Sequence, residues 1–161
     1  MARGLLAGDT DYSHQTFDDM IGDLREWVMS LDETTQTLTT GLQKLETNGY
    51  WKKVDFDVQA TLSYAIRFFI TSRIEIAEIV ETLQNEVEEN HIARIRNLAH
   101  TAIRLDINIG KVWHQYPWNQ QKEYGKPNFS IVELIYSESR SMAVDMIDMD
   151  NLAARLEILS A

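Results

Sequence analysis

The sequence predicts an all-α fold: an elongated antiparallel up-down four-helix bundle with coiled-coil-like packing, in one domain over residues 1–161. Three observations predict it. Apolar residues recur at alternating steps of three and four positions in four long stretches, which places them in one stripe along a helix. Only two prolines and seven glycines occur in the 161 residues. The connections between the first three stretches are short, and short connections favour antiparallel neighbours.

The first helix is predicted at residues 14–48. Asp11 or Ser13 is the candidate cap at its start, and the Asn48–Gly49 pair ends it, because glycine readily adopts the left-handed conformation. The Ser30–Glu33 segment matches an internal capping box, but the stripe keeps its phase there, so one continuous helix is preferred. The stripe consists of Phe17, Ile21, Leu24, Val28, Leu31, Thr35, Leu38, Leu42 and Leu45.

The second and third helices are predicted at residues 56–86 and 90–115, with Asp55 and Asn90 as candidate caps. The apolar spacing breaks phase once between them, so a turn is expected at residues 84–90. A single continuous helix over both stretches is the alternative. The second stripe consists of Leu62, Ile66, Phe69, Arg73, Ile76, Val80, Leu83 and Val87. The third consists of Ile92, Ile95, Ala99, Ala102, Asp106, Ile109 and Trp113.

The fourth helix is predicted at residues 130–159, after a loop over residues 116–128. Pro117 ends the third helix, because the residue before a proline disfavours the helical conformation. The Ser130–Glu133 segment matches a capping box and is the predicted start of the fourth helix. Its stripe consists of Val132, Ile135, Ser139, Met142, Met146, Met149, Ala153 and Leu156.

Three stripe positions are polar, namely Arg73, Asp106 and Ser139. In an up-down bundle these positions fall at a similar height, so the three side chains are expected to form a buried polar layer. An unpaired buried charge is costly, and we therefore expect Arg73 and Asp106 to form an ion pair. Polar groups at single stripe positions fix the register and the partner arrangement of helices, which is the structural role predicted for this layer.

Composition narrows the classes of function. The chain has no cysteine, so it has neither disulfides nor a thiol nucleophile. It contains no run of apolar residues long enough to span a membrane, and its N-terminus does not resemble a secretory signal, so a cytoplasmic location is predicted. The net charge of −10 argues against direct binding of nucleic acid, which needs clustered lysine and arginine. No metal or cofactor site is predicted.

The segment from Arg94 to His100 reads Arg-Ile-Arg-Asn-Leu-Ala-His. It resembles the Arg-x(4–6)-His motif of HEPN domains, which are all-helical and include metal-independent ribonucleases that work as dimers. The resemblance implies that Arg94 and His100 are a catalytic pair, with Asn97 as a helper. In such a pair the histidine moves a proton and the arginine stabilises phosphate charge. A HEPN-like ribonuclease is therefore one alternative function.

Two surfaces are candidate binding sites. One is acidic and includes Glu75, Glu78 and Glu81, and such a surface suits a basic partner. The other is aromatic, and it gathers at one end of an up-down bundle because two connectors lie there. Its members are Trp51, Tyr116, Trp118 and Tyr124. Aromatic side chains are frequent binding anchors, and they also serve as plugs for the open end of a bundle.

The function that we predict first is a non-enzymatic helical interaction protein: an adaptor, small subunit or inhibitor of a larger cytosolic assembly. The acidic and aromatic surfaces would contact a protein partner, for which a basic protein is one candidate. The second helix also has apolar residues away from its stripe, so a homodimer is predicted. These residues are Phe68, Ile70, Ile74 and Ile79. An acidic mimic of nucleic acid that blocks a basic partner is the second alternative.

Overall fold

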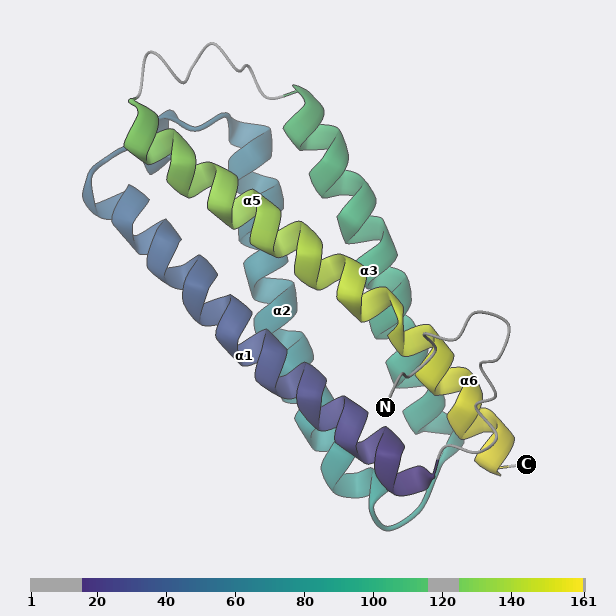
Figure 1. Ribbon diagram of the computed structural model, residues 1–161. Coiled ribbons are helices and arrows are strands. Elements are labelled where there is room, and N and C mark those ends of the chain that lie inside the picture. Colours follow the sequence, from purple (N-terminus) through teal and green to yellow (C-terminus); the bar gives the residue numbers. More distant parts are fainter. Residues whose placement is uncertain (1–15, 116–124, 161) are drawn as a thin grey trace.

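The structure, a computed structural model, describes residues 16–115 and 125–160. Within these ranges the regular structure is helical and no strand occurs, which confirms the predicted all-α fold. The long helices lie lengthwise beside one another in a bundle (Figure 1). The elements are α1 (Phe17–Thr47), the short 3-10 helix η2 (Trp51–Lys53), α2 (Phe56–Leu83), α3 (Glu89–Gln115), α5 (Lys126–Ile147) and α6 (Met149–Ser160).

Local sequence sets both ends of α1. Thr16 caps its start: the Thr16 hydroxyl accepts from the Asp19 backbone N–H, and the Asp19 carboxylate accepts from the Thr16 N–H. The predicted caps at residues 11 and 13 lie outside the described residues. α1 continues without a break through the Ser30–Glu33 segment, as the phase of the stripe predicts. The helix ends before Gly49, whose φ of 78° is the left-handed conformation that favours glycine.

The next two boundaries follow the prediction closely. Asp55 caps α2, because its side chain accepts a hydrogen bond from the Asp57 backbone N–H. α2 ends at Leu83 and α3 begins at Glu89, so the predicted turn is confirmed and the alternative of one continuous helix is wrong. Asn90 lies inside α3 and is not its cap.

The start of the fourth stretch differs from the prediction. α5 begins at Lys126, after Gly125 with φ of 90°, and Pro127 occupies its first turn. Proline suits that turn because the backbone N–H groups there have no helical acceptor. The predicted capping box at residues 130–133 therefore lies inside the helix, and the predicted loop ends earlier than residue 128. Residues 116–124 of that loop lie outside the described residues.

The fourth stretch is also two helices where one is predicted. α5 ends at Ile147, and α6 begins at Met149 after a single turn residue, Asp148. The Asn151 side-chain amide donates to the Asp148 carboxylate at 2.7 Å, and the Asn151 backbone N–H donates to the Asp148 carbonyl at 3.1 Å. These short-range bonds tighten the junction, and no glycine or proline marks it in the sequence.

Side-chain contacts show how α1 lies against the C-terminal helices. Near the end of α1, Asn48 donates to Asn128 of α5 at 2.7 Å, whereas near its start Asp23 lies 3.7 Å from Arg155 of α6. The α1–α2 connector and the start of α5 lie at one end of the bundle, and the α2–α3 connector lies at the other (Figure 1). The up-down order stays a prediction, which these contacts favour.

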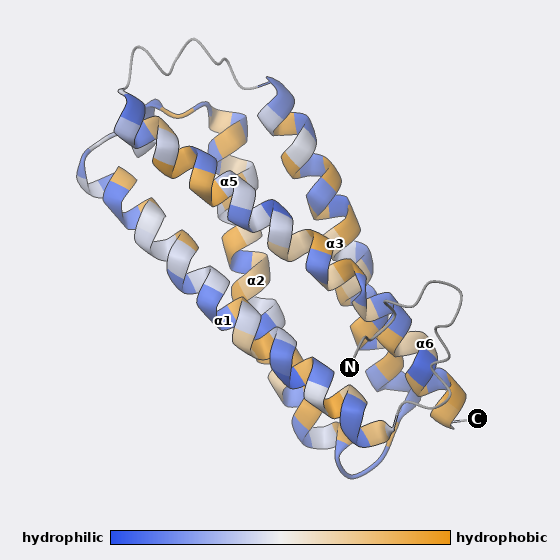
Figure 2. Cartoon of the chain, viewed as in Figure 1, coloured by the Kyte–Doolittle hydropathy of each residue, from blue (hydrophilic) through white to orange (hydrophobic). Residues whose placement is uncertain are grey.

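The core is a continuous layer of apolar side chains between the helices. Hydrophobic and hydrophilic residues alternate along each helix, so each one is amphipathic (Figure 2). α1 and α5 approach closely at Gly41, where a Cβ would lie 3.2 Å from the Ile135 side chain. Within the described residues, no helix is both long and apolar enough to cross a membrane. The largest fully buried side chains are Phe69, Phe129, Met20, Leu24, Leu31, Leu38, Leu45, Ile76, Ile79, Leu83, Ile95 and Leu105.

Candidate functional site

The predicted ion pair between Arg73 and Asp106 is wrong. Arg73 Nε lies 2.8 Å from Asp32 Oδ1 of α1, and its side chain is 41% exposed. Asp106 Oδ1 instead accepts from Arg140 Nε of α5 at 3.0 Å. Both ion pairs lie at the outer edges of helix–helix contacts. The Arg140 guanidinium also donates to the Tyr136 hydroxyl, and that bond, together with Asp106, raises the pKa of Arg140.

The prediction fails because, at this height, the buried residue of each helix is the one directly before the predicted stripe position. In α2 the buried side chain at this height is Ser72, and in α3 it is Leu105, so the neighbouring Arg73 and Asp106 lie at the edges of the core. Ser139 is buried as predicted. The Ser72 and Ser139 hydroxyls have no hydrogen-bond partner among the described residues. The polar groups in the middle of the core are therefore small hydroxyls and not a charge pair.

Sequence reasoning missed the arginine that is buried. Arg155 of α6 is 3% exposed, and its Nη2 lies 3.7 Å from Asp23 Oδ2 of α1. Arg155 directly precedes the stripe residue Leu156, so it occupies the core edge of an amphipathic helix. Its position beside the stripe is the signal in the sequence that could have indicated its burial. The ion pair links the first long helix of the chain to the last helix.

The resemblance to the HEPN motif is not matched by the geometry within one chain. Arg94 contacts α2, where its Nη2 lies 3.1 Å from Glu78 Oε1 and 3.7 Å from Glu75 Oε1. His100 contacts α6, where its Nε2 lies 3.5 Å from Asp150 Oδ1. The two side chains therefore leave α3 toward different neighbours and are not brought together. Asn97 is exposed.

The charge of the predicted acidic surface is partly neutralised by ion pairs within the chain. Glu75 and Glu78 both pair with Arg94, whereas Glu81 is exposed and has no ion pair among the described residues.

At the predicted aromatic end, Trp51 is half-buried against the core, which agrees with the role of a plug. The other predicted aromatic anchors, Tyr116, Trp118 and Tyr124, lie outside the described residues. Nearby, Trp113 stacks on Tyr136 with their ring centroids 4.2 Å apart.

His91 is a buried polar residue at the α2–α3 turn. Its side chain is 3% exposed. Its Nδ1 accepts from the Glu88 backbone N–H at 3.1 Å, so the proton is assigned to Nε2, which lies 2.8 Å from Thr82 Oγ1. His91 thereby joins the end of α2 to the start of α3, and we assign it a structural role.

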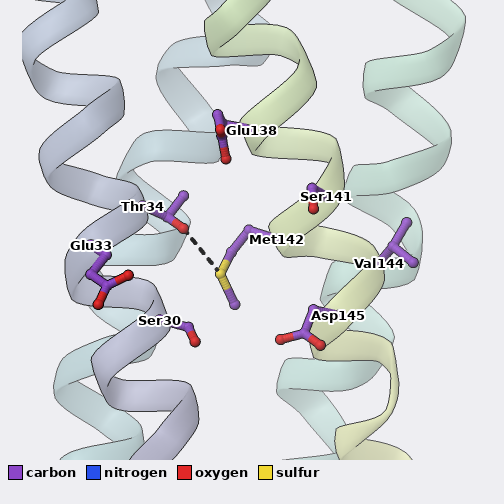
Figure 3. Close-up of a pocket in the computed structure, with 8 residues that line it drawn as sticks. All are labelled: Ser30, Glu33, Thr34, Glu138, Ser141, Met142, Val144 and Asp145. Carbon is purple, nitrogen blue, oxygen red and sulfur yellow. Dashed lines mark hydrogen bonds between the residues drawn. The ribbon is translucent and has the colours of Figure 1, made fainter.

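A groove with a polar lining runs between α1 and α5 and has a volume of about 400 Å³ (Figure 3). Asp145 points from α5 toward α1, and the Thr34 hydroxyl donates to the sulfur of Met142 at 3.5 Å. Carboxylates on both helices suit a cationic group. No group of three histidine, aspartate or glutamate side chains within the described ranges is placed to hold a metal ion. The groove is lined by Ser30, Glu33, Thr34, Glu138, Ser141, Met142, Val144 and Asp145.

An apolar surface lies on the outer side of α1 and α2, and we call it the α1–α2 face. Met29 is 64% exposed, Ile74 is 56% exposed and Ile70 is 42% exposed. Ala77 lies three residues after Ile74 on the same side of α2, and Ala77 and Met29 line one cavity of about 350 Å³. The members of the face are Arg25, Val28, Met29, Ile70, Ile74, Ala77 and Val80.

The chain matches no family model, no curated protein and no solved structure.

Proposed function

We propose that the protein is a non-enzymatic helical interaction protein, and that the α1–α2 face is its contact surface. The observation that supports this proposal is the exposure of Met29 on α1 and of Ile70 and Ile74 on α2, together with the cavity that Met29 and Ala77 line one helical turn after Ile74. Contiguous exposed apolar side chains on a soluble protein mark interaction sites, because they lose contact with water when a partner covers them.

Covering the exposed apolar side chains supplies part of the free energy that a specific contact needs. Covering a large apolar side chain that is half-exposed contributes about 1 kcal/mol, since full burial contributes roughly 1.5–3 kcal/mol. Met29, Ile70 and Ile74 together therefore supply about 3 kcal/mol toward binding. The neighbouring Arg25 and the exposed ion pair of Arg73 form a polar rim around this apolar centre, which is the usual anatomy of a protein interface.

The test is affinity capture of partners from the native cell with three versions of the chain. We expect the unmodified chain to retain a defined partner, and the double variant Met29→Glu/Ile74→Glu to lose it. Ile107→Glu is the matched control, because Ile107 is 59% exposed on α3, away from this face. Equal capture by all three folded proteins would argue that the α1–α2 face is not the contact surface.

A second proposal concerns a basic partner at the α1–α5 groove. Glu33 of α1 and Glu138 of α5 line this groove and have no ion pair among the described residues. We expect a lysine- and arginine-rich peptide to bind there with an affinity that falls as salt is raised, and Glu33→Gln/Glu138→Gln to weaken it. Binding that does not change with salt would count against this proposal and against a mimic of nucleic acid.

A cytoplasmic location is part of the same proposal. It is supported by the absence of cysteine from the sequence, because secreted domains of this size often carry disulfides.

A further inference from the structure

A second stripe runs along the outer side of α2, separate from the stripe that faces the core. Its members follow alternating steps of four and three residues, the spacing that packs one helix against another. Five of them are exposed on this surface: Arg67, Ile70, Ile74, Ala77 and Glu81. The whole stripe consists of Ser63, Arg67, Ile70, Ile74, Ala77 and Glu81. Its centre is apolar, one end carries a base and the other end carries an acid.

We propose that this stripe binds a second copy of the same chain, with the two α2 helices antiparallel about a two-fold axis near residues 70–74. The inference rests on the proposed function, since it names the partner of the α1–α2 face. Reversing the stripe maps it onto itself: Ile70 lies opposite the partner's Ile74, and Arg67 lies opposite the partner's Ala77. A two-fold dimer needs such a self-complementary surface.

The charges on α2 support this occupant. Between residues 63 and 81, three of the five charged side chains already have ion-pair partners: Arg73 pairs with Asp32, and Glu75 and Glu78 pair with Arg94. The remaining two are Arg67 and Glu81, which have no ion pair among the described residues.

Arg67 and Glu81 cannot form an ion pair with each other within one chain. They are separated along the same helix by roughly 21 Å, at 1.5 Å per residue. In the antiparallel dimer, Arg67 reaches past the partner's Ala77 to the partner's Glu81, and the two-fold axis repeats this contact. A parallel pair would instead place like charges opposite each other, so the charge pattern selects the antiparallel arrangement.

The test begins with the molar mass in solution, measured by sedimentation velocity over a wide range of concentration. We expect the unmodified chain to be a dimer, and Ile70→Glu/Ile74→Glu to be a monomer with an unchanged helical circular dichroism spectrum. Ile107→Glu is the matched control and should remain a dimer. A monomeric unmodified chain overturns the inference, as does a dimer that survives Ile70→Glu/Ile74→Glu.

Charge reversal tests the antiparallel register. Arg67→Glu and Glu81→Arg should each weaken the dimer about tenfold, because each creates two like-charge contacts. An equimolar mixture of these two variants should recover dimers, because every Arg67–Glu81 position then joins opposite charges. If the mixture dissociates as readily as either variant alone, this register is wrong.

The two proposals fail in different ways. If the unmodified chain is monomeric but loses its cellular partner on Met29→Glu/Ile74→Glu, the α1–α2 face is a contact surface for another protein. The inference of self-association is then rejected and the proposed function is retained.

Discussion

Arg155 is the most deeply buried arginine among the described residues, and it forms an ion pair with Asp23 of α1. The ion pair of Arg73 with Asp32 is similar in chemistry but lies half in solvent. Water screens an exposed pair and hydrates either partner when the other is lost. A buried charge has no such compensation. Loss of one partner is therefore expected to lower the free energy of unfolding more at the buried pair than at the exposed pair.

We predict that Asp23→Ala lowers the free energy of unfolding by about 3 kcal/mol, because it leaves the buried Arg155 without this carboxylate. Asp32→Ala is the control, and it should cost less than about 1 kcal/mol, since Arg73 is 41% exposed. Urea denaturation followed by circular dichroism measures both values. Equal losses for the two variants would show that burial does not set the contribution of these ion pairs.

At the scale of elements, α6 contacts α3 through an ion pair and a histidine–carboxylate contact as well as through its apolar face. Arg96 donates from Nη1 and Nη2 to both carboxylate oxygens of Glu157 at 3.1 Å, and His100 lies 3.5 Å from Asp150. The hydrogen bond from Arg96 lowers the pKa of Glu157 below its ordinary value, and the bond to Glu157 raises the pKa of Arg96. Ionised Glu157 therefore contributes to the contact of α6 with α3, as one exposed ion pair beside the buried apolar side chains of α6.

This pKa shift predicts how stability depends on pH. Because the folded-state pKa of Glu157 is lowered, its contribution to stability is fully present above the ordinary value of 4.5 and is lost as the pH falls through the lowered value. The unmodified chain should therefore lose more stability on acidification through this range than Glu157→Gln does. Thermal unfolding at a series of pH values measures the difference, and parallel curves for the two proteins would contradict the prediction.

The sequence was sufficient to predict most helix boundaries, because they depend on local signals. Asp55 caps α2 and Gly49 follows α1, as their residue types indicate. The break at Asp148 has no such signal, since the stripe keeps its three-and-four spacing across it. The start of α5 was missed for a different reason. The predicted loop over residues 116–128 includes Pro127, although proline is compatible with the first turn of a helix.

The candidate sites were harder to predict, because they depend on the rotation of each helix. A stripe defined by spacing alone leaves an uncertainty of one residue, which is about 100° around the axis. With that uncertainty, spacing alone does not decide whether Ser72 or Arg73, and whether Leu105 or Asp106, is the buried residue. For the same reason the ion pairs of Arg73 with α1 and of Asp106 with α5 could not be derived from the sequence.

At the scale of the whole molecule, apolar packing supports the bundle while charge is distributed over its outer surface. The net charge of −10 disfavours close approach of two copies, and salt screens this repulsion. The α2 helix is a local exception between residues 63 and 81, since three of its five charged side chains are paired within the chain and the other two, Arg67 and Glu81, have opposite charges. Any association of this protein is therefore expected to begin where its own ion pairs have removed the repulsion.

The contact between Asp23 and Arg155 also has a topological consequence. It brings the beginning of α1 and the C-terminal helix together at one end of the bundle. A short covalent linker can therefore join the start of α1 to the end of α6, and new termini can be opened at the Asn48–Gly49 connector at the far end. Such a circular permutant would keep every helix of the core intact and would move the chain ends to the opposite pole of the molecule.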